Sequence, residues 1–259
     1  MKSFTLMALL GATQATTGTC ATDGTDCSFA KCNKEDTATK KWSPHAFAKT
    51  EGATADLKKA YNACKDHITA SAYCLNNAAS ATKTVAEQCT FDICNKETAK
   101  DSGKWEVSYK STDTDAKTAC ASLVTAEAYC TRNKNDSDGN SRCTFDLCNT
   151  EDSTTHKWSA KYTTKGDSKT ACTNFVTEKA YCRNNAASAT KTVADQCNFD
   201  NCNDSTTANK KTTWKAATLG VTATPTSQCA SYTSPVAYCS NNALDSAGNS
   251  QCNWDNCNS

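Results

Sequence analysis

Apolar residues recur near helical spacing in the stretches that lead up to several of the cysteines. Between Asp115 and Tyr129, the residues Leu123, Val124 and Ala128 fall near one helical face. The same spacing is found in an earlier stretch, at Leu57, Tyr61, Cys64 and Ile68. Apolar residues three and four positions apart lie on one side of a helix, so the spacing predicts a short helix in each of these stretches.

Other segments alternate with a period of two. Residues 143–148 read Cys-Thr-Phe-Asp-Leu-Cys, and residues 157–162 read Lys-Trp-Ser-Ala-Lys-Tyr. Alternation of this kind predicts half-buried strands, and the polar residues 149–153 suit a hairpin loop between them. We therefore predict an α+β fold of small disulfide-rich repeats. Short helices would pack on small β-hairpins in an elongated tandem array, with tryptophan and phenylalanine in each small core. A mostly α fold is the alternative.

The cysteines recur in sets of four, spaced C-x9-C, then x12 or x14, then C-x4-C. The complete sets are Cys64, Cys74, Cys89 and Cys94; Cys120, Cys130, Cys143 and Cys148; Cys172, Cys182, Cys197 and Cys202; and Cys229, Cys239, Cys252 and Cys257. A partial set without a first cysteine comprises Cys20, Cys27 and Cys32. A recurring period of this length predicts an array of modules. We place a signal peptide at 1–15, a partial repeat at 16–41, and full repeats at 42–97, 98–150, 151–204 and 205–259.

Other residue types repeat with the cysteines. A tryptophan precedes each full set, at Trp42, Trp105, Trp158 and Trp214. A tyrosine precedes each second cysteine, at Tyr73, Tyr129, Tyr181 and Tyr238. An aromatic-Asp pair lies between the last two cysteines of a set, and an asparagine follows the fourth, at Asn95, Asn149, Asn203 and Asn258.

The first residues indicate export. Lys2 is followed by a short apolar run and then by small residues up to Ala15, the pattern of a secretory signal peptide. This run is too short to span a bilayer, which takes about 20 residues. We expect no transmembrane segment, and the polar C-terminal residues do not resemble a lipid-anchor signal. The chain is therefore expected to be secreted and extracellular, with the cell surface as one location.

Composition limits the function further. All 19 cysteines follow the proposed cleavage point, which predicts disulfides rather than free thiols. The hydrophobic content is 38%, much of it alanine and cysteine, so a single large apolar core is not expected. The formal net charge is +1, and without a concentrated basic face we expect no nucleic-acid partner.

All nineteen cysteines are assigned as candidate disulfide cysteines, and nine bridges leave one thiol over. Sequence leaves the connectivity open. If the second cysteine of each set pairs with the third, and the fourth pairs with the first cysteine of the next set, Cys257 is left over. If first pairs with fourth within a set, Cys32 is left over. We favour the first scheme because it links neighbouring repeats covalently.

No catalytic or metal-binding residue is assigned, and no cofactor is expected. Zinc sites favour C-x2-C or Cys/His clusters, whereas the close pairs here are C-x4-C. The three histidines, at His45, His67 and His156, occupy non-equivalent positions. The repeated aspartates are interpreted as cap or turn residues; they are Asp92, Asp146, Asp200 and Asp255. Residues 136–140 resemble part of a calcium loop, but the glycine comes too early, so a turn is predicted.

Two sequons fit an exported chain. Asn135-Asp136-Ser137 and Asn203-Asp204-Ser205 each match the N-glycosylation pattern, so Asn135 and Asn203 are candidate glycosylation sites. Asn203 directly follows Cys202, and the neighbouring disulfide is expected to hinder modification there.

The motif C-x-[FW]-D-x-C-N, a following tryptophan and C-x9-C resemble the ciliate surface antigens. These are the immobilisation antigens, including the Paramecium-type surface antigen domain. The resemblance covers Cys20 to Cys257 and rests on composition and cysteine period. It implies an abundant coat protein, displayed outside the cell and recognised by antibodies.

A surface-coat or antigen-like structural protein is therefore the first functional hypothesis. The second is a subunit of an extracellular filament, cyst wall or matrix, since an odd cysteine in an array would suit a homo-oligomer or filament. The third is a secreted binding or protease-inhibitor protein. An enzyme is not expected, because repetition spreads identical residues along the chain instead of bringing unlike residues into one pocket.

Overall fold

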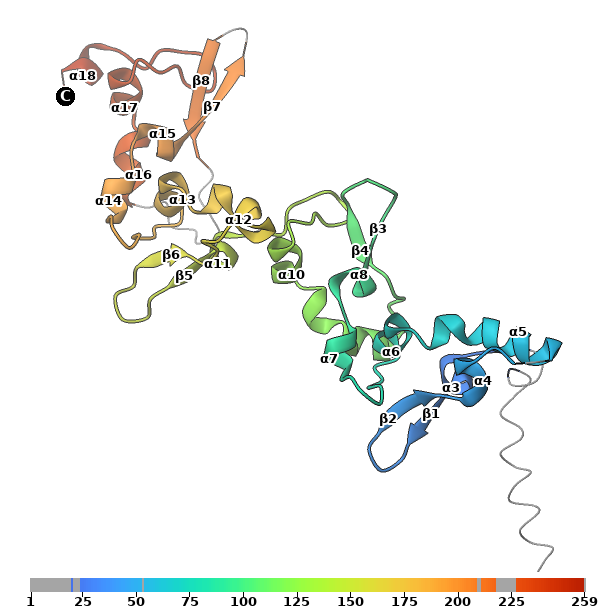
Figure 1. Cartoon of the computed structure of the whole chain (residues 1–259). Coiled ribbons are helices and arrows are strands. Elements are labelled where there is room, and N and C mark those ends of the chain that lie inside the picture. Colours follow the sequence, from blue (N-terminus) through green and yellow to red (C-terminus); the bar gives the residue numbers. More distant parts are fainter. Residues whose placement is uncertain (1–19, 21–23, 53, 209–210, 218–226, 259) are drawn as a thin grey trace, which may run out of the picture. The chain divides into compact units, whose positions relative to one another are not determined.

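The computed structural model describes residue 20 and residues 24–52, 54–208, 211–217 and 227–258 (Figure 1). The predicted signal peptide, residues 1–15, lies outside the described residues. The chain forms two compact units. One comprises residues 1–128 with 135–140, and the other comprises residues 129–134 with 141–259. Both contain the predicted architecture of short helices and two-stranded hairpins, stabilised by disulfides.

Each hairpin is a separate antiparallel sheet of two strands. The pairs are β1 (Asn33–Asp36) with β2 (Lys41–Pro44), β3 (Asn95–Glu97) with β4 (Trp105–Val107), β5 (Asn149–Glu151) with β6 (Trp158–Ala160), and β7 (Asn203–Ala208) with β8 (Lys211–Ala216). Every first strand begins at the repeated asparagine, and every second strand carries the repeated tryptophan. In register, Trp42 faces Glu35, and Trp158 faces Glu151. The predicted repeat boundaries fall within these hairpins, so each hairpin contains residues of two successive predicted repeats.

The tryptophan backbone ties each hairpin to a loop further along the chain. The amide of Trp42 donates to the carbonyl of Ala79 at 2.8 Å, and that of Trp158 donates to Ala187 at 2.8 Å. Trp214 donates in the same way to Leu244. These acceptors all lie between a second and a third cysteine. Each of these contacts adds a backbone hydrogen bond to a pair of short strands that would be only marginally stable alone.

A single helical turn precedes each of the four hairpins, and a fifth copy lies near the C-terminus. These turns are α3 (Phe29–Cys32), α8 (Phe91–Cys94), α11 (Phe145–Cys148), α15 (Phe199–Cys202) and α18 (Trp254–Cys257). The strand predicted over 143–148 is therefore wrong, and the first hairpin strand is the segment interpreted as loop. A turn of helix brings Phe145 and Cys148, three residues apart, to the same buried side, and the Thr144 hydroxyl accepts from the Leu147 amide at 3.4 Å.

The predicted helices are present, but each is divided. The segments are α5 (Ala55–Cys64), η1 (Lys65–His67) and α6 (Ala70–Leu75); α9 (Thr114–Ala119), η2 (Ala121–Leu123) and α10 (Ala126–Thr131); α12 (Asp167–Ala171), η3 (Thr173–Phe175) and α13 (Glu178–Arg183); and α16 (Ser227–Ala230), η4 (Ser231–Thr233) and α17 (Pro235–Ser240). In each group of three, a threonine or serine caps the N-terminus of the last segment. Thr69 accepts from the amide of Ala72 at 3.1 Å, and Thr177 accepts from that of Ala180 at 3.2 Å. The continuous helix predicted over 115–129 is therefore interrupted by a new N-cap.

Three further helices are single turns. These are α4 (Ala46–Lys49), α7 (Val85–Gln88) and α14 (Val193–Gln196). Thr84 and Glu87 form a capping box at the start of α7, and Thr192 and Asp195 form one at the start of α14. Each box fixes the turn that leads into a third cysteine.

The buried interior consists of several small clusters. Some are made mainly of half-cystines, for example Cys74, Cys89, Cys94 and Cys120. Others are aromatic, for example Phe199 and Tyr238 with Trp214 packed against them. Within the described residues, no helix is both long enough and apolar enough to cross a bilayer.

Candidate functional site

The nine disulfides connect the repeats in a chain. Within each set, the second cysteine pairs with the third: Cys74–Cys89, Cys130–Cys143, Cys182–Cys197 and Cys239–Cys252. Between sets, the fourth cysteine pairs with the first cysteine of the next set: Cys32–Cys64, Cys94–Cys120, Cys148–Cys172 and Cys202–Cys229. Cys20–Cys27 closes the partial set. This is the pairing favoured from the sequence. Cys257 is a free, exposed thiol, so its inclusion among the disulfide cysteines is corrected.

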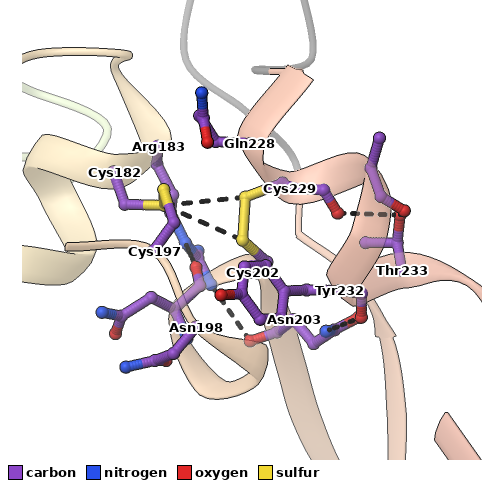
Figure 2. The surroundings of a disulfide bond; sticks show 12 residues. Cys182, Arg183, Cys197, Asn198, Cys202, Asn203, Gln228, Cys229, Tyr232 and Thr233 are labelled. Atoms are coloured by element: carbon purple, nitrogen blue, oxygen red, sulfur yellow. Dashed lines mark hydrogen bonds between the residues drawn. A yellow bond between two sulfur atoms is a disulfide. The ribbon is translucent and has the colours of Figure 1, made fainter. Parts of the chain in front are cut away.

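The disulfides of adjacent sets meet in pairs. The sulfur of Cys182 lies 3.7 Å from that of Cys202 and 3.6 Å from that of Cys229 (Figure 2). The Cys74 sulfur is 3.9 Å from those of Cys94 and Cys120. All of these side chains are buried. Each cluster of two touching disulfides therefore forms the centre of a junction between one set and the next.

The same sulfur clusters bear on metal binding. In each interior cluster the four sulfur atoms lie within 4.8 Å of one another. Four thiolates at one place are the ligand set of a structural zinc site. In the disulfide form each sulfur is bonded to another sulfur and carries no thiolate charge, so the clusters act as covalent cross-links.

An aromatic group packs beside each disulfide cluster. The ring centroids of Phe199 and Trp214 are 5.2 Å apart, and those of Phe199 and Tyr238 are 5.3 Å apart at near-perpendicular planes. Phe145 makes the same two contacts, with Trp158 at 5.1 Å and Tyr181 at 5.3 Å. Edge-to-face contacts add to the area that the rings bury. The predicted tryptophan and phenylalanine cores are therefore confirmed, with tyrosine as a third member.

The asparagine after each fourth cysteine connects these parts. The Asn203 amide nitrogen donates to the carbonyls of Phe199 at 2.9 Å and Tyr232 at 3.0 Å, while its side-chain oxygen accepts from the Tyr238 hydroxyl at 2.9 Å. Asn203 is fully buried. Sequence reasoning found the repeated asparagine and tyrosine but missed this contact; their strict co-occurrence in every full set was the available clue. Burial raises the pKa of Tyr238, which keeps the hydroxyl protonated as a donor.

The glycosylation assignment of Asn203 is corrected by this geometry. A glycan replaces one of the amide hydrogens that the two backbone carbonyls require, and a buried side chain leaves no room for a sugar. A glycan on Asn203 is therefore incompatible with this fold. Asn135, in contrast, has an exposed side chain in the loop before Cys143. Its geometry allows a glycan, and its modification stays a prediction.

The polar residues considered for chemistry lie apart from one another. The aspartates of the C-x-[FW]-D-x-C motif are exposed and occupy the second position of the single-turn helices; they are Asp92, Asp146, Asp200 and Asp255. The Asp136 carboxylate accepts from the amides of Asp138 at 3.1 Å and Asn140 at 2.9 Å, which is the turn expected there. Of the histidines, His45 stacks on Phe47, where burial lowers its pKa, and exposed His156 lies 3.1 Å from Glu151. The third, His67, is half-buried, and its backbone carbonyl accepts from Asn33.

One groove in the second unit carries charge. It has a volume of about 840 Å³ and is lined in part by Trp158, Phe175, Lys179, Arg183 and Asp204. The Arg183 guanidinium donates to the Asp204 carboxylate at 2.7 Å, and Lys179 lies 3.6 Å from the same oxygen. The hydrogen bond from Arg183 lowers the pKa of Asp204. Sequence analysis missed this group. The clue was a departure from the repeat, because Arg183 occupies a position where Leu75 occurs in the first repeat.

These features place the chain among cysteine-rich repeat proteins whose modules are held by disulfides. Nine disulfides in repeated units are typical of secreted proteins in an oxidising extracellular environment. Comparisons with family models, with curated proteins and with solved structures found no match to this chain.

Proposed function

We propose that this chain is an extracellular surface-coat protein, structural in role and similar to the ciliate immobilisation antigens. The observation that carries the proposal is the disulfide pairing of each fourth cysteine with the first cysteine of the next set. This pairing links successive repeats by buried covalent bonds as well as by the main chain. A protein displayed outside the cell benefits from such links, because they restrict unfolding where proteases are present.

The distribution of residues favours a structural role over catalysis. The buried groups at one junction recur at the next, as Phe145, Tyr181 and Asn149 correspond to Phe199, Tyr238 and Asn203. A catalytic site brings unlike residues together once, whereas these residues serve packing and hydrogen bonding wherever they occur. This repetition supports a structural role, in which the chain acts through its repeated surface rather than as an enzyme.

The experiment that tests the coat function is immunogold electron microscopy on unpermeabilised source cells, with an antibody raised against the mature chain. Even labelling along the plasma membrane and cilia is expected. The same antibody absorbed with purified chain serves as the control, and it should abolish the labelling. Absence of labelling on intact cells, with labelling appearing only after permeabilisation, would overturn the proposal.

A subunit of an extracellular filament or matrix is the second candidate. The observation that favours it is the free and exposed thiol of Cys257, since all other cysteines are paired. In the same microscopy experiment, labelling confined to extracellular fibres or walls would replace the coat function by this one.

A further inference from the structure

Four groups of four cysteines bring their sulfur atoms to one place each in the fold. The groups are Cys20, Cys27, Cys32 and Cys64; Cys74, Cys89, Cys94 and Cys120; Cys130, Cys143, Cys148 and Cys172; and Cys182, Cys197, Cys202 and Cys229. In every group the four sulfur atoms lie within 4.8 Å of one another. Apart from half-buried Cys27, these side chains are buried. We call these groups the four-cysteine clusters.

The distances between the two disulfides of a cluster match the edges of a tetrahedral metal site. Four thiolates around Zn²⁺ have Zn–S bonds of about 2.3 Å, which places their sulfur atoms about 3.8 Å apart. The Cys182 sulfur lies 3.7 Å from that of Cys202 and 3.6 Å from that of Cys229 (Figure 2). In the other clusters the corresponding contacts range from 3.5 to 4.0 Å. The sulfur atoms therefore need to separate only along the two disulfide bonds to surround a metal ion.

Buried side-chain amides hold the four segments of a cluster together without involving sulfur. Gln196 donates to the carbonyl of Ala186 at 3.0 Å, which joins the segments that carry the second and third cysteines. Asn203 donates to the carbonyl of Tyr232 at 3.0 Å, which joins the segments that carry the fourth cysteine and the next first cysteine (Figure 2). The cluster of Cys74 has the same two hydrogen bonds, each at 3.0 Å. These contacts remain available when the disulfides are reduced.

The burial of the clusters determines which ligand suits them. Reduction leaves four neighbouring thiols, and buried thiolates without a counter-charge are strongly disfavoured. A soft divalent cation supplies that charge, whereas Mg²⁺ and Ca²⁺ prefer oxygen ligands. Zn²⁺ accepts four thiolates in tetrahedral geometry and has no redox chemistry that would oxidise them. The donor set of each reduced cluster therefore fits Zn²⁺.

We propose that each four-cysteine cluster, once its two disulfides are reduced, binds one Zn²⁺ through four thiolates. The chain thereby exchanges disulfide cross-links for metal cross-links at the same four junctions. The C-x4-C spacing gave no indication of such a site, because the folded chain, and not the spacing, brings the sulfur atoms of a cluster together.

The chemistry balances with a small thiol such as glutathione as the reductant. Two glutathione molecules reduce each disulfide to two thiols and become one oxidised glutathione. Each cluster contains two disulfides and takes up four electrons and four protons in all. Zn²⁺ then replaces the four thiol protons, which are released to solvent.

This inference does not rest on the coat function, because it concerns the reduced chain in solution. Its test uses the full mature chain, purified with its disulfides and reduced without oxygen by a phosphine, which competes little for zinc. The reduced chain is loaded with Zn²⁺ and passed over a column that contains a chelator of about nanomolar affinity. Elemental analysis should find about four Zn²⁺ per reduced chain, one for each cluster, and none per oxidised chain. Circular dichroism should show that Zn²⁺ restores folded structure to the reduced chain.

A matched pair of variants separates a built site from zinc binding by any thiol. Cys182→Ser removes one thiol from a four-cysteine cluster, and Cys252→Ser removes one thiol from outside these clusters. Cys182→Ser should lower the retained zinc from about four to about three per chain, whereas Cys252→Ser should leave it unchanged. Co²⁺ in place of Zn²⁺ should give the absorption bands of tetrahedral thiolate coordination, with about a quarter of the intensity lost in Cys182→Ser alone.

Three results would each overturn the inference. The first is complete removal of zinc by the chelator, which would show loose binding to scattered thiols. The second is an equal loss of zinc in Cys182→Ser and Cys252→Ser, which would show that the number of thiols and not their arrangement determines binding. The third is a Co²⁺ spectrum of octahedral coordination. Localisation by microscopy is a separate measurement, so the failure of one proposal can be told from the failure of the other.

Discussion

The hydroxyl of Tyr238 donates a hydrogen bond of 2.9 Å to the side-chain oxygen of Asn203, and both residues are buried. Tyr73 and Tyr181 make the same bond to Asn33 and Asn149, each at 2.6 Å. Since the tyrosine lies beside the second cysteine of one set and the asparagine follows the fourth cysteine of the set before it, the bond joins neighbouring repeats. It acts beside the disulfide that makes the same connection.

Removing the hydroxyl in Tyr238→Phe should therefore destabilise the C-terminal repeat. The Asn203 oxygen loses its side-chain donor inside a buried junction, which costs about 1–3 kcal/mol. Chemical denaturation followed by circular dichroism measures the loss. The control is Tyr162→Phe, at a half-buried tyrosine outside the aromatic groups, and it should change stability by less. Equal effects of the two changes would show that the bond contributes nothing specific.

Two tryptophans at different positions of the repeat, Trp105 and Trp254, should differ sharply in their contribution to stability. Trp105 is half-buried, with its ring centroid 5.5 Å from that of Phe91, whereas Trp254 is 81% exposed. Trp105→Ala should cost about 2–4 kcal/mol by leaving a cavity beside Phe91. Trp254→Ala should stay within about 0.5 kcal/mol when both are measured by thermal denaturation in a Cys257→Ser background. Similar melting temperatures for the two variants would contradict this account.

Disulfides that close longer loops should contribute more stability. Cys32–Cys64 spans 32 residues and is fully buried, whereas Cys20–Cys27 spans 7 residues. Chain entropy alone predicts that replacing the first pair by alanine costs about 1 kcal/mol more than replacing the second. Urea denaturation of the two double variants tests this. A larger loss on removing Cys20–Cys27 would show that native packing, and not loop closure, determines the order.

The Arg183–Asp204 ion pair should make the folding stability of the chain depend on pH. The hydrogen bond from Arg183 lowers the pKa of Asp204 in the folded chain, so its contribution is present above the unfolded-state pKa of about 3.9 and is lost as pH falls through the lower folded value. Asp204 is about one-third exposed, and solvent screening limits the contribution to about 1 kcal/mol. Asp204→Asn should thus lower the melting temperature more at pH 6 than at pH 2. Asp200→Asn, at an exposed aspartate, is the control.

Glycosylation should discriminate between the two sequons. In a chain secreted from eukaryotic cells, Asn135→Gln should remove a mass that enzymatic deglycosylation also removes, because Asn135 is exposed. Asn203→Gln should leave the glycan mass unchanged and reduce secretion, because it disrupts the buried amide contacts. Mass spectrometry of the secreted chains measures both. A glycan found on Asn203 of folded protein would contradict the burial of that side chain.

Local pattern was sufficient for much of this architecture. The period of the cysteines predicted the modules, and the tryptophans and phenylalanines that recur with them were correctly assigned to each core. The alternation of residues 143–148 misled because six residues with apolar positions two and three apart fit a strand and a helical turn equally well. The helix predicted over 115–129 was divided because Thr125 caps a new segment by accepting from the Ala128 amide at 3.1 Å.

Spacing alone left two disulfide schemes open and could not show that Asn203, within a glycosylation sequon, is a buried hydrogen-bonding centre. Nor could it separate Trp254 from Phe91, Phe145 and Phe199, since all four occupy the motif C-x-[FW]-D-x-C-N. These properties depend on which atoms of distant repeats come within contact distance, as when Tyr238 reaches Asn203. Sequence periodicity specifies the parts because each part is local. The burial of side chains and the pairing of cysteines are decided only in the folded chain, because they depend on the repeat that packs against each motif.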